Sequence, residues 1–239
     1  MKLRVITLFS GYDSQCLALE RLKQNYPQFD YELVAWCEID KAAIAAHNLL
    51  FPQWKDRNVG DICEVNVDKL SDCDLITYSW PCTSVSNAGL QKGLEEGSGT
   101  ASSLVWECFK IFKAKRPKYL VMENVKALTQ KKFMPQFELI QQRLRDLGYT
   151  NFYKVLNSKD YGIPQNRERV FMVSVLDCEK EYVFPEPYPL EKRLKDVLEE
   201  EVPEEYYLSE DKVQRIIDHC DRKVAEGCGF RTRFTPPRV

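Results

Sequence analysis

The chain has 239 residues, of which 44% are hydrophobic and 29% are charged, proportions typical of a globular protein with a sizeable core. No apolar run approaches the roughly 20 residues that a membrane-spanning helix needs, so we expect no membrane partner. The formal net charge of −2 excludes a strongly basic surface over the whole molecule. Basic stretches at 113–118, 131–132 and 231–238 are local, so a nucleic-acid partner would need one patch or another segment to hold it.

The N-terminus and the cysteine content both favour a cytosolic protein. The apolar stretch in MKLRVITLFSG is too short for a signal peptide and predicts a strand instead. Nine cysteines without a secretory signal argue against a disulfide framework, and most should be small buried residues. With no C-x-x-C pair, and only His47 and His219 as histidines, we expect no metal site. Cys82 is the exception among the cysteines, because its neighbours predict a loop.

Apolar runs and amphipathic stretches alternate along the chain up to residue 176. The expected strands are 3–8, 32–37, 74–79, 118–122, 152–156 and 169–175. The expected helices are 14–25, 39–50, 101–114 and 133–147. This alternation predicts an α/β domain with a mostly parallel, doubly wound sheet covered on both faces. Ligands of such folds bind outside the carboxyl ends of the strands.

Three segments at the ends of early strands favour a nucleoside cofactor. Phe9-Ser10-Gly11 follows the first strand, where a glycine lets the backbone approach a ligand. Glu38 ends the second strand, a position suited to accepting hydrogen bonds from ribose hydroxyls. Gly60-Asp61-Ile62 could place a carboxylate and an apolar side chain against an adenine edge. A plain turn glycine and a helix N-cap region remain alternatives for the first two segments.

The strongest signal is an ordered trio of motifs, each adjoining an expected strand. The motifs are Trp80-Pro81-Cys82, Glu123-Asn124-Val125 and Gln165-Asn166-Arg167-Glu168-Arg169. At the ends of strands in one sheet, they would bring together a thiol, a carboxylate and two guanidinium groups. This set suits covalent attack on an electron-poor aromatic ring, with the thiolate adding, the acid handling ring protonation and the arginines holding a ring carbonyl. The glycine-rich segment 83–99 predicts a mobile lid, with an incidental disordered loop as the alternative.

Six segments together resemble DNA (cytosine-5)-methyltransferases, within residues 1–176. They are 8–11, 37–40, 60–62, 74–93, 115–128 and 156–173. The resemblance implies a Rossmann-like fold of the S-adenosylmethionine-dependent type, S-adenosyl-L-methionine as cofactor and double-stranded DNA as partner. It implies that Cys82 adds to C6 of a flipped-out cytosine, whose C5 then takes the methyl group. Glu123 would contact N3 and the exocyclic amine, Arg169 would hold the O2 side, and Arg167 would organise the site or contact the backbone.

The resemblance also assigns the remaining site residues and shows four departures from the family pattern. The implied cofactor-binding residues are Phe9, Ser10, Gly11, Glu38, Ile39, Asp61, Ile62, Pro81 and Leu104, and the implied DNA-contacting residues are Thr83, Ser84 and Ser86. Thr83 replaces the family's glutamine, and Tyr12-Asp13-Ser14 replaces part of the glycine-rich turn. Ile39 replaces an aromatic residue, which predicts weaker adenine packing. The family's arginine late in the catalytic loop is missing from 97–101.

The composition changes after residue 176 to prolines and acidic runs, with one more helix expected at 209–222. We therefore expect a catalytic and cofactor-binding domain at 1–176, and at 177–239 a linker with the start of a truncated target-recognition region. The family's two closing motifs are not visible before Val239. We expect a monomer that folds, needs a complementing C-terminal segment, binds cofactor weakly or not at all, and fails to methylate DNA alone.

Three other functions are weighed against DNA methylation at C5. An RNA cytosine-5 methyltransferase would use identical catalytic residues, and a non-catalytic remnant would bind only cofactor or a partner. Both of these alternatives stay open. Amino-methylating enzymes are disfavoured because a cysteine follows Pro81. The resemblance also suggests a restriction–modification context.

Overall fold

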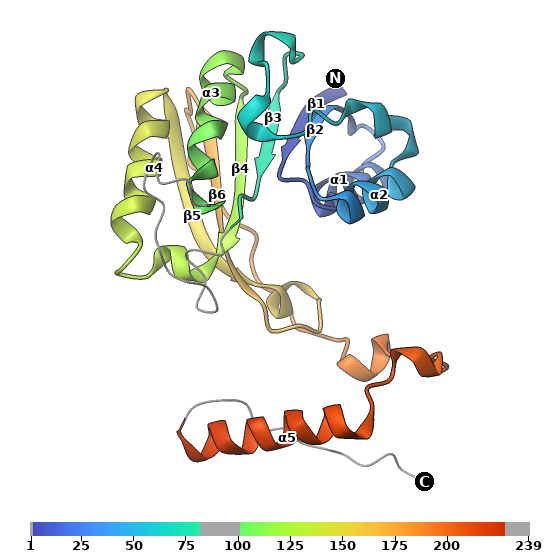
Figure 1. Ribbon diagram of the computed structural model, residues 1–239. Helices are drawn as coiled ribbons and strands as arrows, with labels where there is room; N and C mark the ends of the chain where they lie inside the picture. Colours follow the sequence, from blue (N-terminus) through green and yellow to red (C-terminus); the bar gives the residue numbers. More distant parts are fainter. Residues whose placement is uncertain (1, 82–100, 228–239) are drawn as a thin grey trace. The chain divides into compact units, whose positions relative to one another are not determined.

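The computed structural model describes residues 2–81 and 101–227. It divides into two compact units, Met1–Glu191 and Lys192–Val239, of which the first holds a six-stranded sheet (Figure 1). The strands are β1 (Lys2–Leu8), β2 (Asp30–Cys37), β3 (Leu75–Tyr78), β4 (Tyr119–Val125), β5 (Tyr149–Asn157) and β6 (Glu168–Leu176). The helices are α1 (Ser14–Asn25), α2 (Lys41–Leu50), α3 (Val105–Lys115), α4 (Met134–Asp146) and α5 (Glu210–Ala225).

The strand order is β2-β1-β3-β4-β6-β5. The first four strands are mutually parallel, whereas β6 runs antiparallel to both β4 and β5. The predicted α/β fold with a mostly parallel sheet is therefore confirmed. Several strand bounds differ from those expected, and the difference that matters for the site is at β4, which was expected to end at 122 but continues to Val125, where it pairs with Arg169 of β6. Glu123 consequently lies within a strand, which fixes its backbone more firmly than a loop would.

This topology gathers the sequence motifs at one edge of the sheet. The carboxyl ends of β1, β2, β3 and β4 share that edge, since these strands are parallel. The antiparallel β6 begins there, with Arg169 opposite Val125 and Glu168 opposite Asn157 at the end of β5. The turn after β1, the acid after β2, the segment after β3 and the start of β6 thus meet at the edge where ligands of such folds bind.

Two apolar cores cover the two faces of the sheet. Side chains of α3 and α4, such as Phe112, Phe137 and Ile140, pack with Ile6 and Ile76 in the larger core. The smaller core joins residues of α1 and of the segment after α2 to the opposite face of β1, β2 and β3. Its buried members are Val5, Cys16, Leu19, Tyr31, Leu33, Trp36, Phe51, Trp54 and Leu75. Alternation of neighbouring strand residues between the two cores is what a doubly wound sheet requires.

Two of the helices, α1 and α2, begin at an aspartate whose carboxylate caps them, Asp13 and Asp40. Helix α2 was expected from residue 39 but starts at Lys41, because the carboxylate of Asp40 accepts the N–H of Ala43 at 2.7 Å. Helix α3 was expected from residue 101, but a short 3₁₀ turn, Ala101–Leu104, comes first. No helix in residues 2–81 and 101–227 is both long and apolar enough to cross a membrane.

The chain after β6 stays with the first unit. Strand β6 ends at Leu176, and residues 177–191 belong to the same compact unit as the sheet. The division into a catalytic domain at 1–176 and a recognition region at 177–239 stays a prediction. Within the second unit, the expected helix at 209–222 is α5, which extends to Ala225. Its apolar residues follow helical spacing: Val213, Ile216, Ile217, Cys220 and Val224. None of the side chains of α5 is fully buried.

Candidate active site

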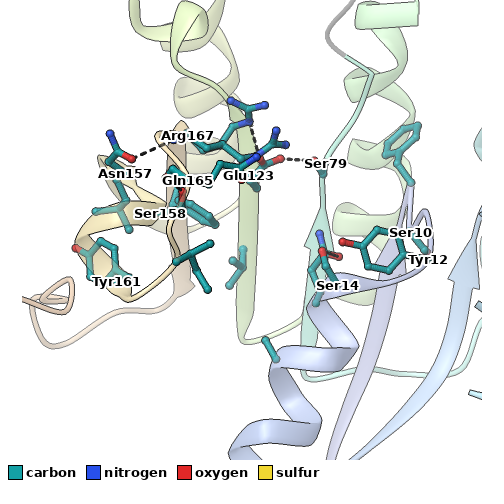
Figure 2. A pocket seen from close by; sticks show the side chains of 18 residues that line it. Ser10, Tyr12, Ser14, Ser79, Glu123, Asn157, Ser158, Tyr161, Gln165 and Arg167 are labelled. Atoms are coloured by element: carbon teal, nitrogen blue, oxygen red, sulfur yellow. Dashed lines mark hydrogen bonds and ion pairs between the residues drawn. The ribbon is translucent and has the colours of Figure 1, made fainter. Parts of the chain in front are cut away.

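A cavity of about 840 Å³ opens at the edge where the motifs meet (Figure 2). One wall comes from the turn after β1 and the start of α1, the other from the loop between β5 and β6, with Glu123 between them. The lining residues are Phe9, Ser10, Tyr12, Ser14, Gln15, Ala18, Ser79, Val121, Glu123, Leu156, Asn157, Ser158, Tyr161, Ile163, Gln165, Arg167, Arg169 and Phe171. Five of the predicted site residues are therefore brought together: Phe9, Ser10, Glu123, Arg167 and Arg169.

Glu123 is held by a partner on each carboxylate oxygen. Its Oε2 accepts a hydrogen bond from Ser79 Oγ at 2.6 Å, and its Oε1 lies 3.1 Å from Nε of Arg169. The side chains of Glu123 and Arg169 are each 24% exposed, so both reach the cavity. Because a carboxylate oxygen can accept more than one hydrogen bond, each oxygen retains capacity for a ligand. The site thus presents an oriented carboxylate and guanidinium side by side.

The backbone of Arg167 is held by hydrogen bonds within the loop between β5 and β6. The N–H of Arg167 donates to Asn157 Oδ1 at 3.1 Å, and its carbonyl accepts from the N–H of Ser158 at 3.0 Å. Arg169 follows, its guanidinium donating to the carbonyl of Glu168 at 2.8 Å. Glu168 in turn pairs with Lys126 at 2.9 Å. Both arginines therefore extend from backbone that is tied to neighbouring elements.

Trp80 and Pro81, which precede Cys82, are held by ring packing and by hydrogen bonds to their carbonyls. Trp80 is 2% exposed and stacks on Tyr78, with ring centroids 5.9 Å apart. Its carbonyl accepts from Asn124 Nδ2 at 3.4 Å, and the carbonyl of Pro81 accepts from Ser102 Oγ at 3.1 Å. Leu104, in the turn that Ser102 shares, packs partly buried against the larger core. Cys82, Thr83, Ser84 and Ser86, as well as the glycine-rich segment 83–99, lie outside the described residues.

The turn after β1 holds three residues in the left-handed backbone conformation. Phe9, Gly11 and Asp13 all have positive φ angles, of 56°, 58° and 67°. A left-handed phenylalanine is unfavourable and typically persists only at functional sites. Asp13 explains the missing glycines, because aspartate tolerates this conformation better than most side chains. Its buried carboxylate also accepts from Thr7 Oγ1 at 2.7 Å and from the N–H of Cys16 at 3.1 Å, capping α1.

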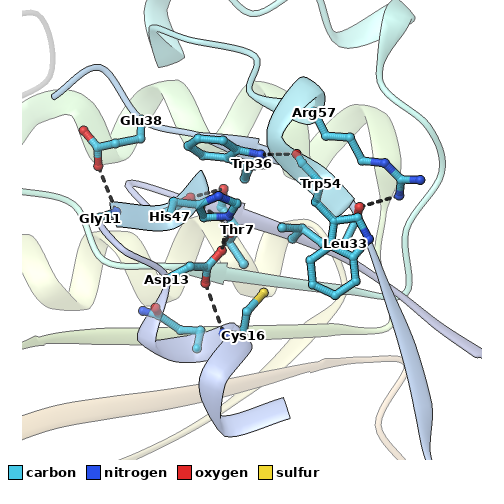
Figure 3. Close-up of polar contacts among 12 residues, drawn as sticks. Thr7, Gly11, Asp13, Cys16, Leu33, Trp36, Glu38, His47, Trp54 and Arg57 are labelled. Atoms are coloured by element: carbon cyan, nitrogen blue, oxygen red, sulfur yellow. Dashed lines mark hydrogen bonds and ion pairs between the residues drawn. The ribbon is translucent and has the colours of Figure 1, made fainter. Parts of the chain in front are cut away.

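A buried histidine lies beneath this turn. His47 of α2 is fully buried and stacks on Trp36 of β2, with ring centroids 3.7 Å apart and planes 17° apart. Its Nε2 lies 3.6 Å from Oδ2 of Asp13, which is longer than a hydrogen bond. The turn, β2 and α2 are therefore joined by a compact cluster of polar and aromatic groups (Figure 3).

Glu38 holds the same turn from the end of β2. One carboxylate oxygen, Oε2, accepts the N–H of Gly11 at 2.9 Å. The other, Oε1, accepts the N–H groups of Ile39 and Asp40 at 2.8 and 2.9 Å. Oε2 therefore keeps a lone pair that could accept a ribose hydroxyl, and this role remains a prediction.

The remaining predicted cofactor residues differ in exposure. Ile39 is 67% exposed, so its apolar side chain is available to a ligand. Asp61 accepts the N–H of Cys63 at 2.9 Å, which caps a short 3₁₀ helix, whereas Ile62 is 5% exposed and packs in the larger core. Among the described residues, Glu38, Ile39, Asp61 and Ile62 do not line the 840 Å³ cavity. Their proposed contacts belong to a region adjoining it.

Of the seven other cysteines that the structure describes, four are buried and therefore poorly placed to act as nucleophiles. Cys16, Cys37, Cys73 and Cys108 are buried, Cys63 is exposed, and Cys178 and Cys220 are partly exposed. Burial raises the pKa of Cys37 and of Cys73 to about 12, so both are thiols at neutral pH. Within residues 2–81 and 101–227, no group of three or more His, Cys, Asp or Glu side chains could hold a metal ion.

Several lining residues were not assigned a role from the sequence. Ser79 is the clearest, because it directly contacts Glu123. Its position could have been predicted from the sequence, because Ser79 directly precedes Trp80-Pro81 and directly follows β3, at the edge of the sheet where the motifs meet. Tyr161 and Ile163 belong to the turn Asp160-Tyr161-Gly162-Ile163, whose glycine signals a bend but not which side chains would enter a cavity.

Comparisons with known proteins identify the family of the chain. The family described as C-5 cytosine-specific DNA methylase matches residues 3–235. The type II methyltransferase M2.ScrFI of Lactococcus lactis subsp. cremoris is 48% identical over 158 residues, 66% of this chain and 44% of that protein. The orphan methyltransferase M.SPRI of Bacillus phage SPR is 32% identical over 246 residues, 90% of this chain and 54% of that protein.

Solved structures support the fold alone. The Entamoeba histolytica methyltransferase EhMeth superposes with a TM-score of 0.71 at 18% identity, covering 89% of this chain and 65% of that one. The S. pombe Dnmt2 methyltransferase gives a TM-score of 0.65 at 20% identity, covering 92% and 66%. The chain spans about half the length of the two curated relatives above. Its fold is the Rossmann-like methyltransferase fold, and the chain belongs to the C-5 cytosine-specific DNA methylase family.

Proposed function

We propose that this chain is the catalytic part of a DNA (cytosine-5)-methyltransferase, which methylates C5 of a cytosine flipped out of double-stranded DNA. The observation that carries the proposal is the Glu123 carboxylate, oriented by Ser79 and Arg169 in an open cavity. The carboxyl group of Glu123 suits the N3 and exocyclic amine of cytosine, where an acceptor or a shared proton is needed. The guanidinium of Arg169 suits O2, where a cationic donor is needed. Relatives named as methyltransferases support the same activity.

The proposed reaction begins with addition of the Cys82 thiolate to C6. The new S–C6 bond pushes an electron pair of the ring toward C5 and N3, so a proton that the Glu123 carboxyl group donates to N3 lowers the cost of the addition, and the carboxylate takes this proton back when the thiolate leaves. Arg169 holds the O2 side, where negative charge also develops. After C5 has been methylated, loss of the C5 proton to a base and departure of the thiolate restore the aromatic ring. Extrusion of the base is required because stacking hides C6 in the duplex.

The residues after β1, β2 and near Gly60 fit a nucleoside cofactor such as S-adenosyl-L-methionine. Among the described residues other than its two chain neighbours, none has a heavy atom within 4 Å of the place where a Cβ would stand on Gly11 or Gly60, so a ligand can approach the backbone there. Glu38 has a lone pair for a ribose hydroxyl, and Ile39 offers an exposed apolar surface. When bound, the cofactor supplies an electrophilic methyl group. Phe9, Ser10, Gly11, Asp61, Ile62, Pro81 and Leu104 complete the proposed contacts.

The test is covalent trapping on duplex DNA in which every cytosine of one strand is 5-fluorocytosine, because the fluorine blocks loss of the C5 substituent. The protein is supplied with S-adenosyl-L-methionine, alone and with the C-terminal segment that we propose completes it. We expect an adduct that mass spectrometry assigns to Cys82, that is lost in Cys82→Ser and that is retained in Cys178→Ser.

The same experiment separates the alternatives. Trapping on the RNA counterpart but not on DNA would establish the RNA methyltransferase instead. No adduct with either nucleic acid, in the presence of the complementing segment, would favour a non-catalytic remnant. An adduct that persists in Cys82→Ser would contradict the assigned nucleophile.

A further inference from the structure

Two tyrosines tie the loop between β5 and β6 to the chain that follows β6. The phenol of Tyr188 donates to the carbonyl of Tyr161 at 2.7 Å, and its backbone N–H donates to the carbonyl of Asp160 at 3.0 Å. In return, the phenol of Tyr161 donates to the carbonyl of Pro185 at 3.0 Å. The two rings meet edge to face, with centroids 6.1 Å apart and planes 89° apart. We call residues 182–188 the strap and residues 157–167 the site loop.

Gly162 is adapted to this contact in two ways. Its φ angle is +81°, a conformation that other residues rarely adopt. A Cβ at this position would also lie 3.0 Å from the phenol oxygen and 3.1 Å from a ring carbon of Tyr188. The absence of a side chain therefore lets the Tyr188 ring lie directly against the tip of the site loop.

The strap is itself fixed along β5. Tyr182 lies against Phe152 of β5, with ring centroids 6.2 Å apart, and it meets Phe184 edge to face at 5.0 Å. The chain therefore passes from the end of β6 back to the edge of the sheet where the cavity opens. The strap is also the stretch through which the first unit continues toward residue 192.

The site loop carries one wall of the cavity. Tyr161, Ile163 and Gln165 line the cavity from the loop, and Arg167 ends it. Two hydrogen bonds join the start of the loop to its end. Ser158 Oγ donates to the carbonyl of Gln165 at 2.6 Å, and the N–H of Ser158 donates to the carbonyl of Arg167 at 3.0 Å. A shift of the loop tip would therefore be passed to the backbone of Arg167.

We propose that Tyr188 is a positioning residue for the methyl transfer reaction, holding the site loop at the distance from Glu123 that a cytosine requires. The proposal rests on the proposed function. Tyr188 does not line the cavity formed by the described residues, so it acts through Tyr161 and the loop. Misplacement of a wall by a fraction of an ångström lowers the rate of the chemical step more than it weakens DNA binding.

The experiment compares Tyr188→Phe with Tyr182→Phe in the full chain. Both substitutions remove one phenol oxygen from the same strap, but only Tyr188 uses its phenol to hold Tyr161. Hydrogen exchange at the N–H groups of Ile163 and Arg167 should become about fivefold faster in Tyr188→Phe, as expected for the loss of one net hydrogen bond. Tyr182→Phe should leave these exchange rates unchanged.

The functional arm measures the single-turnover rate of adduct formation on the 5-fluorocytosine duplex, with the complementing segment present. In Tyr188→Phe the maximal rate should fall about fivefold, while the DNA concentration giving half the maximal rate stays the same. Unchanged exchange rates would overturn the proposal. Faster exchange with an unchanged maximal rate would also overturn it, because the contact would then be structural only.

The two proposals fail in different ways. If the unsubstituted protein forms no adduct under these conditions, the proposed function is contradicted. The exchange rates would then still decide whether Tyr188 holds the site loop. A lower maximal rate in Tyr182→Phe equal to that in Tyr188→Phe would show that the whole strap, and not the Tyr188 phenol, sets the position.

Discussion

The two ends of the site are built in different ways. At the turn after β1, two carboxylates hold the backbone: Glu38 accepts three backbone N–H groups, and the buried Asp13 accepts two donors. At the end of β4, Glu123 has one partner on each oxygen, and the side chain of Arg169 remains 24% exposed. The first end is therefore a turn fixed by hydrogen bonds to its own backbone, whereas the second presents a carboxylate and a guanidinium to an open cavity.

Because of this difference, substitutions at one end should affect mainly the stability of the fold, and substitutions at the other end should affect mainly the reaction rate. Changes at the turn after β1 remove buried interactions, so they should lower the free energy of unfolding. Changes at Glu123 remove groups that face an open cavity, so they should lower the reaction rate with little loss of stability.

Glu123→Gln should lower the single-turnover rate by about 10²–10⁴-fold, the usual contribution of a group that transfers or shares a proton in the transition state. Cofactor affinity should change little, because Glu123 lies on β4 and not in the turn after β1. Rapid-quench kinetics at saturating DNA would check the rate. Ser79→Ala is the smaller companion change, and we expect about a tenfold decrease through loss of one hydrogen bond to a charged group. A near-normal methylation step in Glu123→Gln would overturn its role.

Asp13→Gly should destabilise the fold by about 3 kcal/mol, because it removes a buried carboxylate that caps α1 and contacts His47. Asp13→Ala should be less stable than Asp13→Gly by about another 1 kcal/mol, because φ at this position is +67° and alanine is strained there. Urea unfolding measures both differences. Ser14→Ala, one residue later and exposed, is the control and should stay within about 0.5 kcal/mol. Equal stability of the alanine and glycine variants would show that the left-handed turn is not maintained.

Asp74→Asn gives the smallest effect, at the edge of the sheet opposite the site. Arg4 holds the pKa of the Asp74 carboxyl below its ordinary value by hydrogen bonds to both oxygens, at 2.9 and 3.2 Å. The stabilisation is fully present above the unfolded-state pKa of about 3.9 and is lost as the pH falls through the lower folded-state pKa. We expect a loss of about 1 kcal/mol at pH 7 that shrinks at pH 3, measured by urea unfolding. A difference that grows toward pH 3 would contradict the sign.

The sequence predicted the fold well because its strands are short apolar runs bounded by polar turns. All six strands were expected, and α1 was expected with its observed bounds from its helical spacing. The position of β6 between β4 and β5, and its antiparallel direction, could not be predicted from hydrophobic periodicity, because local patterns do not determine the order of strands in a sheet. That insertion is what extends β4 and places Glu123 inside a strand.

The candidate site was predictable only where a motif adjoins a strand end. Glu123 and Arg169 met this condition and lie 3.1 Å apart. The contact between Tyr161 and Tyr188 joins residues that are 27 positions apart in irregular chain, so no spacing rule points to it. Asp13 was read as a departure from a glycine-rich turn, whereas its side chain supplies the cap and its backbone the left-handed geometry.

The most direct test of the central claim is the chemical identity of the methylated base. The protein, together with the complementing segment, is incubated with duplex DNA and S-adenosyl-L-methionine carrying a trideuterated methyl group, and the nucleosides are analysed by mass spectrometry. We predict 5-(trideuteromethyl)cytosine as the labelled product, its complete loss in Cys82→Ser, and no labelled product from residues 1–239 alone. Labelled N4-methylcytosine or N6-methyladenine, or no labelled base with the complementing segment present, would contradict the account.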